Sequence, residues 1–435
     1  MLDLLYIFLV IAALATVMLI ASVAVSKRKV SAEVGRKSVH AGMGLLCMLF
    51  PLLFDETTPV VILAILAVIS LVYIKFSKLK NTLGTSIFSV DRLSLGELIF
   101  PLAVAWIFTL ANGKWTLYVI SLLLLTLADT VGAIAGSKFG KKHYTTIAGN
   151  KTVEGSIAFF LTSVLCISIP LLLFEHLPFT SVIVLACAVG LFTTAVEGAS
   201  GNGIDNLLIP VGSFLLLDSY QNLAGEMLVF RIILLLAILT VLLYTKKLHT
   251  FDGGAILTVL LYAFAATTLG GIPCLLACLL VLTHHILLQY KMCSTLVATH
   301  SLSIIIAIAI PTLLWLTLGI RNIYDPSSAQ LGFILSLSIA ISMLHAGTQK
   351  FLNAPTASLL KGGLLSLLVM LPILLVYPIE KLPSQPIAVS LMLTPLFSRL
   401  YYSWKASNND QDPLYWLKFC LLLLTASTPL FFILS

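Results

Sequence analysis

Apolar runs of roughly 17 to 25 residues recur from one end of this chain to the other, and each is long enough to cross a membrane as a helix. A soluble domain carries about a quarter charged residues, whereas charged residues make up 10% of these 435. The runs lack the alternation of apolar and polar residues that membrane β-strands show. We therefore predict an all-α, polytopic transmembrane helical bundle.

The chain contains enough apolar sequence for about 14–16 membrane-spanning helices. The pieces at 40–54 and 204–217 are short, so each is consistent with a full span or a re-entrant segment. We expect a multi-pass protein of a bacterial inner membrane or of the endoplasmic reticulum. The predicted spans lie near residues 2–25, 40–54, 58–74, 94–111, 115–136, 155–174, 178–197, 204–217, 227–244, 254–270, 273–289, 295–319, 330–348, 358–378, 387–402 and 414–434.

Lysine and arginine are distributed unevenly over alternate loops of the first half. The loops near 26–37, 75–92, 137–151, 197–206 and 244–252 hold 15 of these residues, and the four intervening loops hold 2. Basic loops stay in the cytoplasm, so the N-terminus is predicted to lie outside. The same bias accounts for the net charge of +7, and no nucleic-acid partner is expected.

The first polar cluster is Glu33-x-x-Arg36-Lys37-x-x-His40, at the start of the second predicted span. Spacings of three, four and seven place Glu33, Arg36 or Lys37, and His40 on one face of a helix. A basic segment at a membrane surface would also serve simply to set topology. His40 is not needed for topology, which makes this face a candidate catalytic surface.

The second cluster is Ala128-Asp129-Thr130, inside the apolar run 115–136 and toward its cytoplasmic end. A carboxylate in such a run is costly to bury unless it is paired or bound to a metal, so Asp129 is a candidate catalytic residue. A purely structural pair with a lysine or arginine of another helix is the alternative. Gly132, Gly136 and Gly140 follow at four-residue spacing, which permits close helix packing.

The third cluster joins the basic run Lys138–Lys142 to the segment Gly149–Ser156, GNKTVEGS. Glycine amides, lysines and hydroxyls beside the start of a helix are suited to binding phosphate groups. Glu154, close to Lys151, would supply a carboxylate for Mg²⁺, which binds acidic ligands together with phosphate oxygens. The residue order is not that of a Walker A motif, and a basic loop followed by a helix N-cap is the structural alternative.

The fourth cluster is the glycine-rich loop Glu197–Asn206, which carries Glu197 and Asp205. No lysine or arginine of this loop is available to neutralise the two acids, so they either face water or bind a cation. Together, the four clusters supply lysines for a polyphosphate, acids for Mg²⁺ and a histidine. Phosphoryl transfer requires such groups, and the acceptor would be a lipid alcohol that arrives from the bilayer.

In this order, the four clusters resemble motifs of the membrane-bound phytol kinase, farnesol kinase and dolichol kinase family, within the wider phosphatidate cytidylyltransferase-like superfamily. The residues that carry the resemblance are Arg36-Lys37-x-x-His40, Ala128-Asp129-Thr130, Gly140-Lys141 with Lys151-Thr152-x-Glu154-Gly155-Ser156, and Glu197 with Asp205-Asn206-x-x-x-Pro210. The resemblance covers about residues 30–217 and implies a CTP-dependent kinase of an isoprenoid lipid alcohol that uses Mg²⁺. The KRxxKD core of CDP-diacylglycerol synthases is absent, which favours a kinase over a cytidylyltransferase.

The resemblance also implies a role for each matching residue. Asp129 would bind metal or act as general base for the acceptor hydroxyl, and Arg36, Lys37 and His40 would bind the lipid-side phosphate or stabilise the transferring group. The residues implied to bind the nucleotide are Lys142, Lys151, Thr152, Gly155, Ser156 and Asn206, and those implied to bind the metal are Glu154, Asp205 and Glu197.

Residues 1–226 are thus predicted to form a lipid-alcohol kinase-like membrane domain, and residues 227–435 a second helical membrane module of unassigned role. Diacylglycerol is an alternative acceptor, and cytidylyl transfer is an alternative reaction. The main alternative of another class is a lipid or solute transporter, because transporters also contain many spans. The polar clusters argue against transport, since they are predicted at cytoplasmic helix ends. The pattern makes no prediction for the oligomeric state.

Overall fold

In the computed structural model, the chain divides into two compact units, Met1–Leu236 (unit 1) and Ala237–Ser435 (unit 2). The boundary predicted after residue 226 lies ten residues before this division, and the helix α12 (Gly225–Tyr244) continues across both positions. The structure describes residues 2–27, 32–82, 84, 96–146, 149–175, 177–201, 203–220, 225–245, 251, 253–291, 301–320, 322–349, 355–407 and 415–434.

Helices form where the sequence predicted spans, because a backbone in lipid must satisfy its own N–H and C=O groups. Each of the sixteen predicted ranges overlaps a helix. Within the described part of the chain, eight helices are long and apolar enough to cross a membrane, and four shorter apolar helices accompany them. The all-α membrane fold is confirmed, whereas the number of spans stays a prediction.

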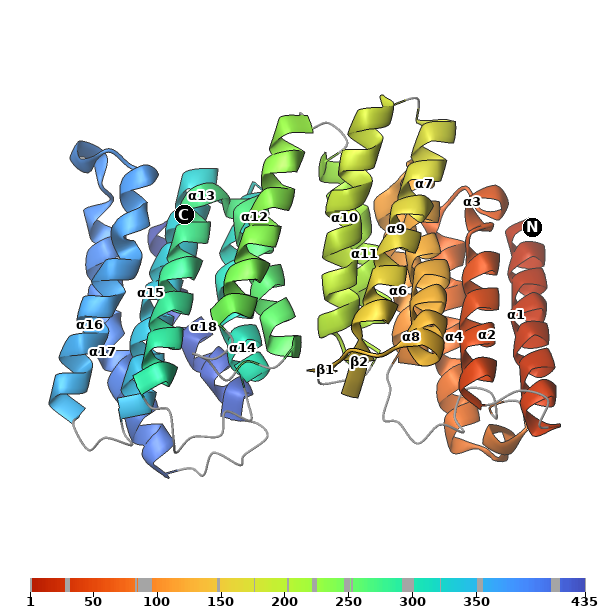
Figure 1. The fold of residues 1–435 in the computed structure, drawn as a ribbon, viewed down its shortest axis with the longest axis horizontal. Helices are drawn as coiled ribbons and strands as arrows, with labels where there is room; N and C mark the ends of the chain where they lie inside the picture. Colours follow the sequence, from red (N-terminus) through yellow and green to blue (C-terminus); the bar gives the residue numbers. More distant parts are fainter. Residues whose placement is uncertain are drawn as a thin grey trace. The chain divides into compact units, whose positions relative to one another are not determined.

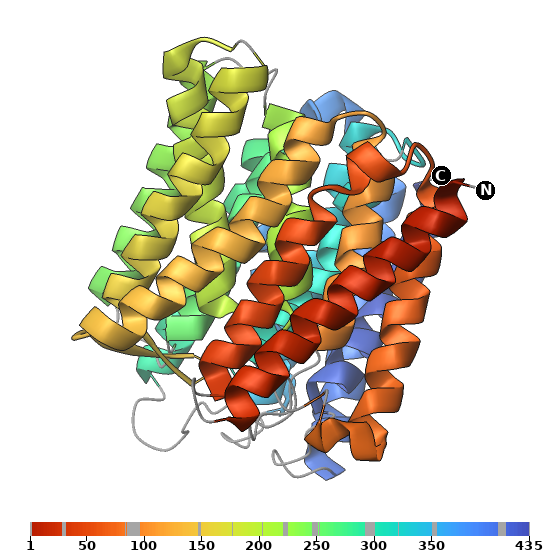
Figure 2. The same ribbon diagram turned by 90° about the vertical axis from the view of Figure 1, so that its right-hand side faces the viewer.

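Unit 1 is a set of helices that run back and forth between two ends (Figures 1 and 2). The free end of α1 lies at one end, and a β-hairpin lies at the other. The helix ends that flank the three most basic loops lie at the hairpin end, as the charge pattern predicts for loops that share one side. The elements are α1 (Leu2–Ser26), α2 (Ala32–Cys47), α3 (Phe50–Leu53), α4 (Thr57–Phe76), η1 (Lys78–Asn81), α6 (Gly96–Ala111), α7 (Trp115–Leu123), η2 (Leu124–Ala128), α8 (Asp129–Phe139), β1 (His143–Thr146), β2 (Gly149–Thr152), α9 (Val153–Phe174), α10 (Phe179–Ala199), α11 (Asp205–Tyr220) and the first part of α12.

The hairpin joins α8 to α9 and fixes the start of α9. Strands β1 and β2 are antiparallel, and their register places Tyr144 opposite Lys151. Thr152 then caps α9, because its Oγ1 accepts a hydrogen bond from the backbone N–H of Gly155 at 3.2 Å. The N-cap that was the structural alternative for the third cluster is therefore present.

Glycines allow α8 and α9 to pack closely. A Cβ on Gly155 would lie 3.0 Å from the carbonyl oxygen of Gly132 and 3.1 Å from the Cα of Gly136. A Cβ on Gly136 would lie 2.8 Å from Oγ1 of Thr152. The four-residue glycine spacing thus serves close helix packing, as predicted, and it holds the hairpin end of α9 against α8.

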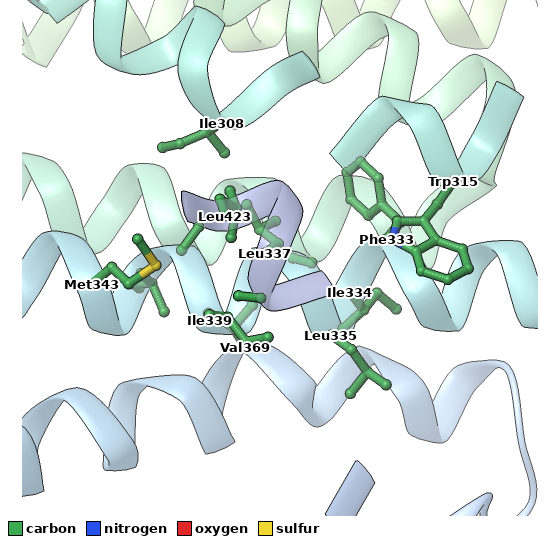
Figure 3. Packing of buried hydrophobic residues seen from close by; sticks show 14 of the residues in the cluster. Ile308, Trp315, Phe333, Ile334, Leu335, Leu337, Ile339, Met343, Val369 and Leu423 are labelled. Atoms are coloured by element: carbon green, nitrogen blue, oxygen red, sulfur yellow. The ribbon is translucent and has the colours of Figure 1, made fainter. Parts of the chain in front are cut away.

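Unit 2 is built around α15. In its apolar part, within Pro326–Ala346, 89% of the residues are buried. Figure 3 shows apolar side chains such as Phe333 and Leu337 packed there. Trp315 donates to the hydroxyl of Ser336 at 2.9 Å, one of several buried polar contacts between helices. The elements are the rest of α12, α13 (Gly253–Lys291), α14 (Ser301–Ile320), α15 (Pro326–Gln349), α16 (Pro355–Met370), η5 (Leu371–Leu375), η6 (Ile379–Lys381), α17 (Ser384–Ser407) and α18 (Tyr415–Ile433).

Two predicted spans of unit 2, near 254–270 and 273–289, are two helices that follow each other in α13 and pack side by side. The ring of Phe251, just before the first helix, stacks on that of His285 in the second, with the ring centroids 5.3 Å apart. The break between the two helices is at Gly271, which has φ 71° and ψ −166°. Glycine adopts positive φ without steric cost, and Pro273 supplies no backbone N–H to the helix. The two helices and the break between them were therefore predicted at the right place.

Candidate active site

The first and second clusters meet at an ion pair inside unit 1. Lys37 of α2 donates to Oδ2 of Asp129, the first residue of α8, at 2.5 Å. The two side chains are mostly buried, with exposed fractions of 18% and 15%. The pairing offsets the cost of burying either charge alone. The structural alternative for Asp129, a tie to a basic residue of another helix, is therefore present.

Asp129 lies inside the apolar span Trp115–Phe139, in the part that leads to the hairpin. Its helix was expected to end at residue 136, but α8 continues to Phe139, and Gly140 is the first residue to leave it. Gly136 lies against Thr152 of the hairpin, and it follows Asp129 by seven residues, or about 10 Å of helix. The predicted span also ended seven residues after Asp129, so the structure agrees with the predicted depth to within one helical turn, and the cytoplasmic side stays a prediction.

A π turn separates α7 from α8. In this turn, η2, the backbone N–H of Asp129 bonds to the carbonyl of Leu124, five residues back. His40 of α2 places Nε2 3.3 Å from the carbonyl oxygen of Leu125, and its ring packs edge-on against Phe100. A carbonyl can only accept, so Nε2 carries the hydrogen of this bond. Lys37 and His40 thus share one helix face, as their spacing predicted.

A second ion pair joins the third cluster to the fourth. Lys151 of β2 donates to Oε1 of Glu197, on α10, at 2.8 Å, and also to the carbonyl oxygen of Glu197. Each of the two side chains is 19% exposed. Glu197 therefore has a partner that the prediction of water or a cation did not include, and its role as a metal ligand stays a prediction. Its neutralising base comes from the hairpin, 46 residues earlier, and not from its own loop.

The two ion pairs belong to one electrostatic cluster, which we call the carboxylate cluster. Its members are the acids Asp129, Glu197 and Asp205 and the bases Arg36, Lys37 and Lys151. Asp129 and Asp205 each lie close enough to Glu197 to interact with its carboxylate. Arg36, which is half-buried, interacts in the same way with Asp129. Residues from α2, α8, the hairpin, α10 and α11 therefore converge at one place in unit 1.

Tyr144 also lies at this place, although no sequence motif predicted it. Its hydroxyl lies 2.7 Å from Oγ of Ser156, and both Glu197 and Lys151 interact with it electrostatically. Burial raises the pKa of Tyr144, so the hydroxyl is protonated at neutral pH. Residues 137–151 were predicted to form a loop. Recognition of a hairpin there would have identified Tyr144 as the strand partner of Lys151.

Glu154 has different partners from those predicted. Its two carboxylate oxygens accept hydrogen bonds from the backbone N–H groups of Lys141 and Lys142, at 3.0 to 3.2 Å. Thr152 and Gly155, which were predicted to bind nucleotide, form the N-cap and the close contact between α8 and α9. These three residues hold the basic loop against the start of α9, and Glu154 does not pair with Lys151.

The other residues predicted to bind nucleotide, Lys142, Ser156 and Asn206, each have contacts of their own. Lys142 has an exposed side chain, and Ser156 bonds to Tyr144. Asn206 donates from Nδ2 to the carbonyl oxygen of Gly96 at 2.9 Å, which ties the start of α11 to the start of α6. The side chain of Glu33 lies outside the described residues.

The other contacts of the acidic residues limit which of them could hold a metal ion. No group of three or more His, Cys, Asp or Glu side chains in the described ranges could hold a metal ion. Mg²⁺ on a nucleotide needs only one or two carboxylates besides phosphate oxygens and water. Glu197 and Asp205 can supply these, whereas both oxygens of Glu154 are engaged by backbone amides.

Comparison with known proteins finds two kinases. The chain is 29% identical over 190 residues to the phytol kinase of Synechocystis sp., a match that covers 42% of this chain and 78% of that protein. It is 28% identical over 204 residues to the CTP-dependent diacylglycerol kinase 1 of Schizosaccharomyces pombe, covering 42% of this chain and 92% of that protein. No family model matches the chain, and no solved structure gives a significant match. The similarity to lipid kinases that the motifs indicated is thus supported in its general form.

Proposed function

We propose that unit 1 transfers the γ-phosphoryl group of CTP to the hydroxyl of an isoprenoid lipid alcohol at the cytoplasmic side of the membrane. The observation that carries the proposal is the convergence of the pairs Lys37–Asp129 and Lys151–Glu197 in one cluster. Buried charges in a membrane protein mark functional sites, and these include the acids and bases that phosphoryl transfer requires. The similarity to a phytol kinase and to a CTP-dependent diacylglycerol kinase supports the donor and the class of acceptor.

The hairpin end of the cluster is the proposed nucleotide side. Lys151 exchanges Glu197 for phosphate oxygens, and the exposed Lys142 adds positive charge at the same loop. Glu197, released from Lys151, and the neighbouring Asp205 would hold Mg²⁺. When it is bound, the metal supplies positive charge that offsets the negative charge of the phosphates.

The Asp129 end of the cluster is the proposed acceptor side. The lipid hydroxyl oxygen forms a bond to the γ-phosphorus while the bond to the bridging β–γ oxygen breaks, and CDP leaves. Asp129 takes the hydroxyl proton, and Lys37 with Arg36 offsets the charge of the transferring group. Asp129 lies about 10 Å deeper than the hairpin, so the alcohol reaches it without leaving the membrane.

The test is phosphorylated lipid formed by the purified full chain in liposomes, with CTP, Mg²⁺ and a panel of phytol, farnesol, dolichol and diacylglycerol. Lys151→Met should reduce the product to background. Lys114→Met is the matched control, because Lys114 also forms an ion pair, with Asp218, but in the connection between α6 and α7. The control should retain near wild-type activity.

Three outcomes separate the alternatives. Phosphorylation of diacylglycerol alone would keep the kinase and replace its acceptor. Lys151→Met with full activity would show that the site is misplaced. A folded wild-type chain that forms no phosphorylated lipid from any acceptor would contradict the proposal and leave the transporter as the better hypothesis.

A further inference from the structure

The π turn before Asp129 leaves a backbone carbonyl without its usual donor. In a regular α-helix the N–H of Asp129 would bond to the carbonyl of Leu125, four residues back. Here it bonds to the carbonyl of Leu124. Leu125 is 1% exposed and Leu124 is 0% exposed, so this turn is closed to bulk solvent. A buried carbonyl that loses its donor destabilises the turn unless another group replaces it.

His40 supplies the replacement donor. Its Nε2 lies 3.3 Å from the carbonyl oxygen of Leu125, and its ring is held edge-on against Phe100, with the ring centroids 5.1 Å apart. The bond comes from another helix, since His40 belongs to α2. An N–H group engaged by a backbone carbonyl is not free to bind a phosphate oxygen.

The π turn determines where Asp129 points. It accommodates one residue more than a regular turn, and each residue of an α-helix rotates the chain by about 100°. Asp129 is the first residue after the turn. If the turn reverted to regular α-helix, the carboxylate would rotate away from Lys37. One face of α2 thus makes both contacts: Lys37 pairs with Asp129, and His40, three residues later, stabilises the π turn before Asp129.

We propose that His40 is a positioning residue, whose hydrogen bond to the carbonyl of Leu125 maintains the π turn that aims Asp129 at Lys37 and the acceptor. The inference rests on the proposed function in so far as Asp129 acts in phosphoryl transfer. It replaces the prediction that His40 itself contacts phosphate. It also explains why a histidine occurs at a half-buried position that topology does not require.

Amide side chains distinguish positioning from catalysis by the imidazole. The amide of His40→Gln can reach the place of Nε2, whereas that of His40→Asn reaches only the place of Nδ1. His40→Gln should therefore keep kcat within about threefold of wild type, while His40→Asn and His40→Leu lower kcat by about 10²-fold, the usual effect of a misplaced catalytic group. The KM for CTP should change less than about twofold in all three, because the nucleotide end of the site is untouched.

A second measurement does not depend on activity. The coupling between Lys37 and Asp129, measured as the non-additivity of Lys37→Met and Asp129→Asn in unfolding experiments, should persist beside His40→Gln. It should fall by at least half beside His40→Leu, because the carboxylate no longer points at the lysine.

The outcomes that would overturn the inference are distinct from failure of the proposed function. Equal loss of kcat in His40→Gln and His40→Leu, with both folded, would assign the chemistry to the imidazole. Full activity in His40→Leu, or an unchanged coupling between Lys37 and Asp129 in that variant, would show that the π turn does not need His40. A wild-type chain without kinase activity would refute the proposed function, and the coupling measurement would then decide the positioning role by itself.

Discussion

Replacing Lys37 by methionine removes the charge that neutralises Asp129 while keeping a side chain of similar length. The two charged atoms are 2.5 Å apart, so at an effective dielectric constant of about 20 their attraction is about 7 kcal/mol. Desolvation of both groups offsets most of this attraction. Loss of one partner of a fully buried pair costs about 3–5 kcal/mol. Because these side chains are 18% and 15% exposed, we expect Lys37→Met to lower the free energy of unfolding by about 2–4 kcal/mol.

Asp129→Asn should lower the free energy of unfolding by less, about 1–2 kcal/mol, because the flexible lysine can extend its ammonium toward the hairpin end of α2. The double variant has no charge to bury and should be more stable than Lys37→Met. The resulting coupling energy is about 2–3 kcal/mol. The assay is equilibrium unfolding in mixed detergent micelles, followed by the helical circular dichroism signal.

The pair Lys114–Asp218 provides the control cycle. Its side chains are 51% and 33% exposed, and exposed pairs contribute about 0–1 kcal/mol. The reasoning would be refuted by a coupling between Lys37 and Asp129 below about 0.5 kcal/mol, since a mostly buried ion pair would then behave like a surface pair.

Three further predictions concern the hairpin and the contact between α8 and α9. Gly155→Ala should lower the free energy of unfolding by about 1–3 kcal/mol, because the new Cβ meets backbone atoms of α8. Gly363→Ala, with open space around its Cβ, should change it by less than about 1 kcal/mol; equal effects would contradict the packing argument. Tyr144→Phe and Ser156→Ala should each raise the KM for CTP about threefold to tenfold, and together no further, because both remove the same hydrogen bond. Burial raises the pKa of Tyr144 and keeps its hydroxyl protonated to higher pH. The ratio of the KM for CTP of Tyr144→Phe to that of the wild type should therefore stay constant up to about pH 9. A change of this ratio near neutral pH would contradict the prediction.

The membrane fold was predictable because hydrocarbon imposes one simple requirement on sequence, a long apolar run with few charges. The same simplicity made a lone buried acid conspicuous, which is how Asp129 was found. Periodicity placed Lys37 and His40 on one face of α2, and their contacts agree with it. Local spacing was sufficient to predict which residues of one helix share a face.

Long-range pairing and irregular backbone were not predictable from local pattern. Glu197 has no base in its own loop, and only the folded hairpin brings Lys151 to it. The π turn has no sequence signature, because LLTLA would fit a regular helix equally well. Lys151 and Glu154 are close in sequence, but the chain passes from β2 into α9 between them, so the two side chains have different partners.

The most direct test of the account uses CTP labelled at two positions. If the carboxylate cluster transfers a phosphoryl group, label from the γ-phosphate should enter the lipid product, and label from the α-phosphate should remain in CDP. Both signals should depend on Lys151 and Asp129. Entry of α-label into the lipid would instead show cytidylyl transfer, and it would contradict the claim that this site is a lipid kinase.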